Sequence, residues 1–393
     1  MIIKSFNAKN GDAIHIISSD GNNIIVDMGY PETYKKYISK SIKEIEIKNE
    51  NIDLLIITHI DYDHISGAIS FFEDIHNGKY KKGILKQIWH NSYRHLSMST
   101  RVNANNVDYN IVNTFLNRLS IYSSLNIGQE ISALKGSTLA GLILKSGIGW
   151  NELHSYNPII EGTETTIGDI AITALLPNEY ILNKLKLHWR NELRKLKYNF
   201  EFAEDEIFDD AFEFYLLNEK EQDDGTLIST DVGDNFNKLL DIGNILESQS
   251  DTSVSNASSI VTIIESKNIR ILLTGDALDC DLVEAITRQK ENGLNINFDL
   301  VKLSHHGSKK NNYEWLKLVR SNYYLISTDT SKHNHPDIEA IVNIILSNRI
   351  NKKTICFNND LEIISKIDDK KLKEKYNYSI MRPNRCWGLE IEL

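Results

Sequence analysis

The sequence predicts an α/β protein that carries its chemistry at the ends of strands. Short apolar runs rich in isoleucine alternate with segments of helical periodicity along most of the chain. Two of these runs lead directly into loops rich in histidine, after residues 57 and 303. Open α/β sheets bind ligands at the carboxyl ends of strands, so these loops are the expected functional sites. The 393 residues allow a large core, either as one domain with insertions or as two or three domains.

The first half of the chain opens with three predicted strands separated by turn sequences at residues 10–12 and 20–22. Helical spacing of apolar residues predicts helices over residues 32–48 and 65–75. His15 lies in the alternating pattern of the second strand, where a core or edge histidine is expected rather than a ligand. The predicted strands of this half are residues 2–7, 13–18, 23–27, 54–57 and 84–89.

The second half repeats the alternation of strands and helices. Its predicted strands are residues 166–175, 259–264, 270–277, 298–303, 323–327, 353–357 and a final pair within 377–392. Its predicted helices are residues 181–198, 279–290, 312–320 and 337–348.

Two long segments interrupt this rhythm and are interpreted as insertions. Residues 93–165 include a predicted helix, 107–125, and lie near the expected site entrance; a plain surface excursion is the alternative. Residues 178–258 begin with the basic helix 181–198, and an acidic stretch at 201–224 follows it. Opposite charges favour a helical pair that neutralises itself, and a partner or nucleic-acid surface is the alternative. The rest of this insertion, rich in Asp, Ser, Asn and Gly, predicts a lid-like loop.

The loop after residue 57 concentrates four metal-ligating side chains within six residues. They are His59, Asp61, Asp63 and His64. Imidazoles and carboxylates together form the ligand set that zinc, manganese or iron(II) accepts. A polar loop with a helix-capping aspartate would explain one of the carboxylates and neither imidazole. The spacing therefore favours a metal site.

Three later motifs also follow predicted strands. Asp276 ends one strand, and the adjacent pair His305 and His306 follows the next. Two adjacent histidines at a strand end are seldom structural, because each ring needs a partner. His335 precedes Pro336 in a third loop, where it would contact either phosphate or ligand residues, with a helix-capping role as the alternative.

These motifs resemble those of the metallo-β-lactamase-fold hydrolases. The first loop resembles the signature His-x-His-x-Asp-His, with Asp61 in place of the second His, a variant similar to the metal-hydrolase domain of bacterial DNA-uptake (competence) proteins and to phosphorylcholine esterases. The segments Thr274-Gly275-Asp276-Ala277, Ser304-His305-His306-Gly307-Ser308 and Asn334-His335-Pro336 resemble the same subgroup and occur in the same order. The resemblance covers roughly residues 1–92 and 165–392. It implies a single αββα sandwich over residues 1–392, with two mixed sheets and the helical insertions 93–165 and 178–258.

The resemblance also implies a ligand set for two Zn²⁺ ions, with Mn²⁺ as an alternative. His59 and Asp61 would face one ion, Asp63 and His64 the other, and Asp276 would bridge them. His305 or His306 would complete the set. The family's third-motif histidine has no counterpart before the Asp276 strand, where Asn256 stands instead. The number of ions, one or two, is left open by this departure.

Composition limits the setting of this chemistry. The formal charge of −10 disfavours an exposed basic surface for unspecific nucleic-acid binding. The three cysteines are far apart and lack CxxC spacing, so we expect reduced core residues of a cytosolic protein. No basic leader or long apolar run is present, which predicts a cytoplasmic protein without a membrane span. Heavy use of Ile, Asn and Lys suggests an AT-rich bacterial coding sequence.

The favoured function is hydrolysis by a metal-activated water, with Asp63, His306 and His335 in catalytic roles. Carboxylate-rich ligation suits phosphoesters better than β-lactams, so a nuclease or nucleotide phosphodiesterase is expected. Gating by a protein partner bound to the insertions is a further expectation. His90, Lys309 and Lys310 could contact substrate, and structural or exposed roles are the alternatives. The competing hypothesis is a regulatory or scaffold subunit of a multi-protein bacterial system, for example a defence system.

Overall fold

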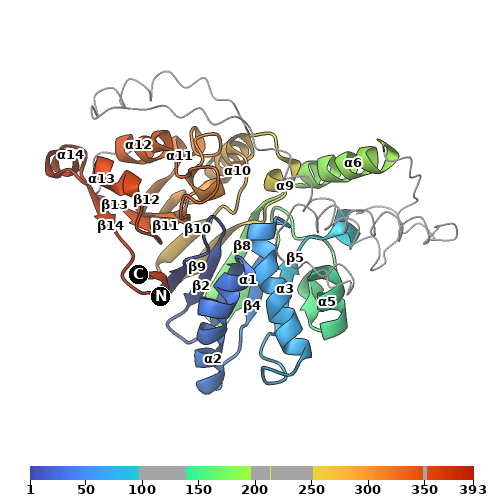
Figure 1. Cartoon of the computed structure of the whole chain (residues 1–393). Coiled ribbons are helices and arrows are strands. Elements are labelled where there is room, and N and C mark those ends of the chain that lie inside the picture. Colours follow the sequence, from blue (N-terminus) through green and yellow to red (C-terminus); the bar gives the residue numbers. More distant parts are fainter. Residues whose placement is uncertain (97–138, 196–212, 214–250, 348–351) are drawn as a thin grey trace.

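A computed structural model describes residues 1–96, 139–195, 213, 251–347 and 352–393. The predicted helix 107–125 and nearly all of the predicted acidic stretch and lid-like loop lie outside these residues. Within the described residues the strands form two sheets, and the chain termini lie side by side where β1 (Ile2–Phe6) pairs with β15 (Gly388–Glu392) (Figure 1).

The first sheet has seven strands in the order β15-β1-β2-β3-β4-β5-β6. Its second half is parallel from β3 to β6, and its first half is antiparallel. The strands added to β1 and β15 are β2 (Ala13–Ile17), β3 (Asn23–Met28), β4 (Leu54–Ile57), β5 (Gln87–His90) and β6 (Gly149–Trp150).

The second sheet has eight strands in the order β14-β13-β12-β11-β10-β9-β8-β7. It is parallel from β10 to β14 and antiparallel from β7 to β10. The strands are β7 (Glu164–Ile167), β8 (Ile170–Leu176), β9 (Val261–Ser266), β10 (Ile269–Leu273), β11 (Asn297–Lys302), β12 (Arg320–Ile326), β13 (Lys353–Phe357) and β14 (Tyr378–Met381).

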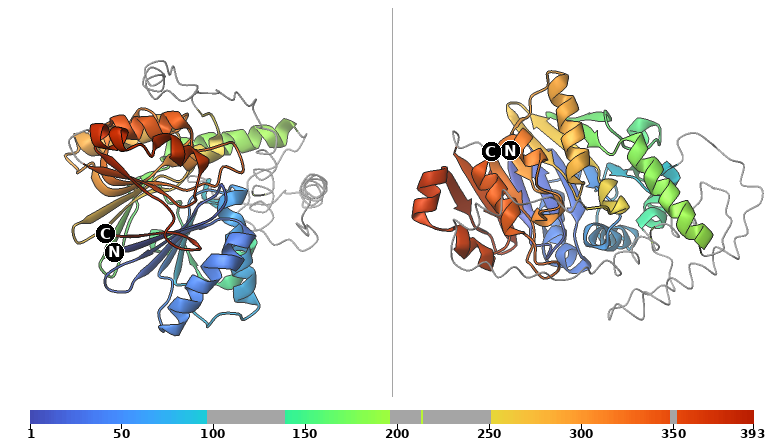
Figure 2. Two further views of the ribbon diagram at one scale, coloured as in Figure 1. Left: turned by 60° about the vertical axis from the view of Figure 1, so that its left-hand side comes forward. Right: turned by 90° about the horizontal axis from the view of Figure 1, so that it is seen from above.

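The two sheets face each other, and helices cover their outer faces (Figure 2). Strand β4 shows how the apolar pattern produces these layers. Leu54 and Ile56 point into the core between the sheets, whereas Leu55 and Ile57 point to the helices outside. A strand buried on both faces needs an unbroken apolar run, which is what its four residues provide. The predicted αββα sandwich is therefore confirmed.

The helices flank the sheets in chain order. Those beside the first sheet are α1 (Pro31–Thr33), η1 (Tyr34–Ile38), α2 (Ser39–Ile47), α3 (Tyr62–His76) and α5 (Leu139–Ser146). Those beside the second sheet are α10 (Asp279–Glu291), α11 (Trp315–Leu318), α12 (Ile338–Leu346), α13 (Glu362–Ile367) and α14 (Lys370–Tyr376). Helix α6 (Glu179–Lys195) and the short α9 (Val254–Ala257) contact each other. Short 3₁₀ turns are η2 (Tyr93–Leu96), η4 (Glu152–His154) and η6 (Ser304–Gly307).

Several local predictions were wrong. The predicted strand 166–175 is a hairpin of β7 and β8, and the predicted final strand pair is divided between the sheets, because β14 pairs with β13 and β15 with β1. Within the predicted insertion 93–165, β6 pairs with β5 and α5 packs against α3, so these elements extend the core. Of the three cysteines only Cys356 is buried, while Cys280 and Cys386 are exposed.

No helix among the described residues is long and apolar enough to cross a lipid bilayer.

Candidate metal centre

The candidate site lies where strand ends of both sheets meet. Strands β3 and β4 supply Asp27 and the loop from Thr58, and β10 and β11 lead to Asp276 and His306. Two glycines allow neighbouring backbone segments to pack closely against each other at the site. A Cβ at Gly11 would lie 2.1 Å from the carbonyl oxygen of Asp63, and one at Gly67 would lie 2.1 Å from that of Met28. The loop between β1 and β2 therefore packs directly on the metal loop.

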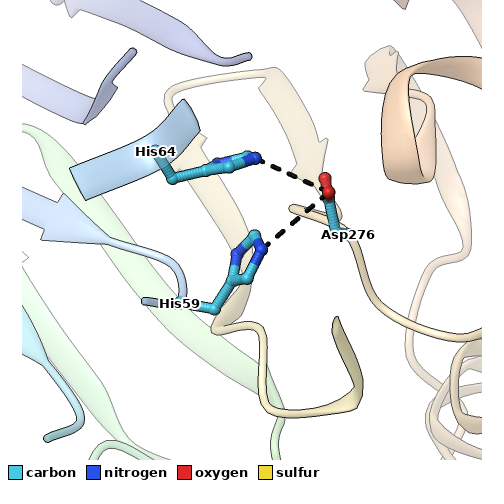
Figure 3. Close-up of side chains that lie close together, drawn as sticks. All are labelled: His59, His64 and Asp276. Atoms are coloured by element: carbon cyan, nitrogen blue, oxygen red, sulfur yellow. Dashed lines mark ion pairs between the residues drawn. The ribbon is translucent and has the colours of Figure 1, made fainter. Parts of the chain in front are cut away.

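Asp276 is the centre of the arrangement. Figure 3 shows His59, from the loop after β4, and His64, from the first turn of α3, pointing at its carboxylate. Its Oδ2 atom lies 3.5 Å from His64 Nε2 and 3.9 Å from His59 Nε2. His306 Nε2 lies 3.5 Å from the same oxygen and His305 Nε2 lies 4.0 Å from it. Burial opposes the charge on Asp276, but the neighbouring imidazoles outweigh it and hold the pKa of the carboxyl well below its usual value.

His64 is oriented from behind by Asp27. Its Nδ1 lies 2.8 Å from Asp27 Oδ2, and Asp27 also accepts hydrogen bonds from the backbone N–H and hydroxyl of Thr58. Burial works against charge on both groups. It raises the pKa of Asp27, whereas the carboxylates of Asp276 and Asp27 outweigh burial at His64 and hold its pKa well above the usual value. This geometry leaves Nε2 of His64 directed at Asp276.

His59 is held between Thr58 and Asp61. Its Nδ1 lies 3.0 Å from the Thr58 hydroxyl, and its Nε2 lies 2.6 Å from Asp61 Oδ2. The other oxygen of Asp61 accepts a 2.7 Å hydrogen bond from Ser255, which lies on α9. Asp61 is thus fixed by a residue almost two hundred positions away in the chain.

On the opposite side, His306 and Asp63 face each other. His306 Nδ1 lies 2.9 Å from the Ser327 carbonyl oxygen, and its Nε2 lies 3.6 Å from Asp63 Oδ2. Burial opposes a charged His306, but Asp276 and Asp63 raise its pKa to about 9. Burial likewise opposes ionisation of Asp63, but His306 and His64 lower its pKa to about 2. Asn10 donates a 3.0 Å hydrogen bond to Asp63 and accepts one from Tyr30.

A buried lysine lies under the site. Lys302 is 1% exposed, donates to the carbonyl oxygen of Gly275 at 2.8 Å and forms an ion pair with Asp12. Its Nζ lies 3.7 Å from Asp276 Oδ1. Burial lowers the pKa of a lysine, but Asp12 and Asp276 outweigh it and raise the pKa of Lys302. Lys302 therefore supplies one permanent positive charge to a cluster of carboxylates.

The residues present fit a bound divalent cation. His64 Nε2, His306 Nε2 and Asp276 Oδ1 are buried and have no hydrogen-bond partner among the described residues. Buried polar atoms in native proteins almost always have a partner, and a cation is one that imidazole nitrogens and carboxylates share. Two compact groups of donor atoms meet here, His59 with His64 and Asp276, and Asp63 with His64 and His306. Further groups join Asp12 to Asp27 and His64, and to Asp276 and His306.

Most of the predicted site residues lie in one cluster, and two of them lie at or beyond its edge. His59, Asp61, Asp63, His64, Asp276 and His306 form the centre. His305 lies at its edge, and His335 lies behind His305, with ring centroids 5.4 Å apart. Asn256, the expected counterpart of the third-motif histidine, donates its amide to Asp251 at 2.8 Å.

The candidate substrate contacts lie farther out. His90 is fully buried and its Nε2 lies 3.7 Å from Glu213 Oε1, which favours the structural alternative. Lys309 Nζ donates to Glu339 at 2.9 Å, so its charge is already partnered. His15 binds Ser41 and Asn23 inside the core, as expected for a structural histidine.

Sequence reasoning missed Asp12, Lys302, Ser255 and Asp251 as members of the site. Lys302 stands in an apolar strand that leads to the paired histidines, and a lysine at an inward strand position was a usable signal. Asp12 stands in a turn sequence and carries no such signal. Ser255 and Asp251 lie near the end of the predicted insertion 178–258, far in sequence from the metal loop, so only the tertiary structure brings them to the site.

Comparison with known proteins supports this description. Residues 11–142 match the family model of the Metallo-beta-lactamase superfamily. The chain thus carries a match to a metallo-β-lactamase superfamily domain, and its two mixed sheets with outer helices are consistent with that fold. The match covers the first metal loop, and the competence-protein subgroup stays a prediction. No curated protein matches the sequence.

Solved structures with similarity to the chain share little sequence with it. Zn²⁺-bound PqqB from Methylobacterium extorquens has a TM-score of 0.35 and 8% identity, over 97% of this chain and 87% of that one. A long form RNase Z from yeast has a TM-score of 0.37 and 9% identity, over 94% of this chain and 43% of that one. A CmlA beta-hydroxylase mutant has a TM-score of 0.37 and 11% identity, over 100% of this chain and 53% of that one.

Proposed function

We propose that the chain is a metal-dependent hydrolase of phosphodiester bonds, a nuclease or a nucleotide phosphodiesterase. The observation that carries the proposal is the convergence of His59, His64 and His306 on one oxygen of Asp276. A scaffold subunit gives no reason to bury this many ionisable groups, because an uncompensated buried charge is costly. The cluster is therefore better explained as a site that binds cations.

The ligands would be His59, Asp61, Asp63, His64, Asp276 and His306, and the ions Zn²⁺ or Mn²⁺. When bound, such a cation lowers the pKa of water from near 16 to about 7 and so supplies hydroxide at neutral pH. The chain's own residues hold the site in position for this chemistry. Asp27 fixes the ring of His64, Ser327 fixes that of His306, and Lys302 offsets part of the carboxylate charge.

His335 is the proposed positioning group for the leaving oxygen. Burial lowers its pKa, so the imidazole is neutral near pH 7, and its Nδ1 lies 3.5 Å from Asp337 Oδ2, which holds the ring in place. A neutral imidazole can accept a hydrogen bond or orient an oxygen. We therefore assign His335 to orientation of the leaving group rather than to its protonation.

Phosphodiesters are favoured over lactams because Asp61 and Asp63 make the ligand set rich in carboxylate. The formal charge of −10 argues against broad nucleic-acid binding. We therefore propose a restricted substrate, or activity gated by a protein that binds the insertions 93–165 and 178–258, in a cytoplasmic setting.

The test has two parts. Elemental analysis of the purified protein should find transition metal at one to two ions per chain; none, even after zinc or manganese is added, would contradict the proposal. A screen of single- and double-stranded DNA, RNA, cyclic nucleotides and a chromogenic phosphodiester should then show weak, manganese-stimulated turnover.

His59→Ala and Asp63→Ala should abolish this turnover. His333→Asn is the matched control, because His333 is exposed and lies in the loop of His335. Turnover of a thioester or lactam without phosphodiester turnover would overturn the substrate class. Metal binding without turnover of any substrate would favour the partner-gated form.

A further inference from the structure

The paired histidines adopt an uncommon backbone conformation. His305 has φ 43° and ψ 54°, and His306 has φ 56° and ψ 20°. Residues other than glycine seldom adopt this left-handed region, and here it changes the direction of two adjacent side chains. In an extended strand, adjacent side chains point to opposite faces. Here the turn instead directs both rings to Asp276, with Nε2 distances of 4.0 and 3.5 Å to its Oδ2 atom.

All four imidazoles around Asp276 share one pattern of contacts. Each directs Nε2 at Asp276 and has a polar partner on Nδ1. The partners are the Thr58 hydroxyl for His59, Asp27 for His64, the Ser327 carbonyl for His306, and Asn311 at 3.2 Å with Asp251 at 3.5 Å for His305. Metal-ligating histidines in proteins are held in this way, with the second ring nitrogen bound to a carboxylate or carbonyl. His305 therefore has the support expected of a ligand.

The partners of His305 place it on the side of Asp61. Asp251 accepts hydrogen bonds from Asn256 at 2.8 Å and from Asn311 at 2.9 Å. Asn256 follows Ser255 on α9, and Ser255 donates to Asp61. A continuous chain of contacts thus joins His305 to Asp61. His306, in contrast, faces Asp63.

We propose that His305 is a metal ligand that replaces the missing third-motif histidine. It would serve the ion bound by His59 and Asp61, while His306 would serve the ion bound by Asp63 and His64. Asp251 would be the outer partner that orients His305. This inference rests on the proposed metal-dependent function and deepens it, because it gives the centre two ions and assigns the two adjacent histidines to different ones.

The test measures metal binding rather than turnover. Co²⁺ would be titrated into chelator-treated protein, with visible absorption following the ligand field and elemental analysis giving the number of ions bound. His305→Asn is the main variant, because asparagine tolerates the left-handed backbone and is too short to replace the imidazole. His333→Asn is the matched control, since His333 also has a positive φ of 58° and is exposed.

The wild-type protein and His333→Asn should bind two ions. His305→Asn should bind one ion tightly and the second with reduced affinity. The reduction should exceed the roughly 10- to 100-fold loss of affinity that follows removal of a residue that only orients a ligand. Asp251→Asn should weaken the same ion by roughly 10- to 100-fold. Circular dichroism of each variant, with His305→Gln as a second substitution, separates loss of the ligand from loss of the fold.

Double variants assign the ion. The double variant His305→Asn, Asp61→Asn should still bind one ion tightly, because both substitutions remove ligands of the same ion. His305→Asn with Asp63→Asn should bind neither ion tightly. Two equally tight ions in His305→Asn would overturn the ligand proposal, and if that variant also lost turnover, His305 would face substrate. A wild-type protein that binds no Co²⁺ would instead contradict the proposed function itself.

Discussion

The metal-free protein should lose stability as the pH rises from 6.5 to 9. His306 has a folded-state pKa of about 9 against an ordinary value of 6.5, since Asp276 and Asp63 outweigh the effect of burial. A raised pKa means that the folded state holds its proton more tightly than the unfolded state. The stabilisation is therefore complete below pH 6.5 and is lost as the pH rises through about 9.

The size of the effect follows from the same values. Each tenfold change in proton affinity corresponds to about 1.4 kcal/mol, so His306 alone accounts for about 3 kcal/mol. This is a large part of the roughly 5–15 kcal/mol by which a domain is stable. His64 adds to the same trend, because its pKa is also raised. Asp63 adds no slope in this range, because its pKa of about 2 leaves it ionised throughout.

Urea denaturation in the presence of a chelator, at pH values from 6.5 to 9, measures this trend. The decrease of the free energy of unfolding with pH should be smaller in His306→Gln and unchanged in His333→Asn. With saturating Zn²⁺ or Mn²⁺ the slope should disappear or reverse, because metal binds the deprotonated imidazole. A metal-free protein whose stability is flat across this range would refute the electrostatic description of the site.

Three further predictions concern single residues. Asp276→Ala should reduce phosphodiesterase activity by more than roughly 100-fold, which is the upper end of the loss seen when a residue that only supports a metal ligand is removed. His90→Ala, Lys309→Ala and Lys310→Ala should each reduce the activity less. Wild-type turnover by Asp276→Ala would exclude its central role. Gly11→Ala should destabilise the protein by about 1–3 kcal/mol in thermal melts, because its Cβ would meet the Asp63 carbonyl, and an unchanged melting temperature would show that this loop yields freely. Lys302→Met should cost about 3–5 kcal/mol in chelator, because Asp12 and Asp276 lose their buried cation, and added metal should restore part of it; equal losses with and without metal would contradict this.

The sequence was sufficient for the fold class because the apolar pattern is strong. The all-apolar strand β4 and the amphipathic helix α3 on either side of the metal loop follow from their periodicity. Pairing between distant strands does not follow from periodicity. Strands β14 and β15 are close in sequence, yet β14 extends the second sheet and β15 pairs with β1 of the first. Nothing local to residues 377–392 distinguishes these partners.

In the candidate site, too, the local features could be predicted from the sequence and the long-range contacts could not. The ligands within the loop of His59 to His64 could be predicted, because their spacing is short and their chemistry is unusual for a strand end. The groups that hold them could not, since Ser255 reaches Asp61 and Asp12 reaches Lys302 only through the tertiary structure. His305 is intermediate. Its motif was visible in the sequence, but the backbone turn that directs it to Asp276 was not.

The charges of the centre explain why protons and metal ions compete there. Asp12, Asp27, Asp61, Asp63 and Asp276 are five carboxylates at the site, and the buried Lys302 faces two of them, Asp12 and Asp276. The raised pKa values of His64 and His306 show that protons make up part of the missing positive charge when no metal is bound. A divalent cation would take over that role, since it needs the same nitrogen atoms in their deprotonated form. Metal affinity and pH-dependent stability are therefore two consequences of one excess of carboxylate, and residues that supply charge, such as Lys302, should alter both together.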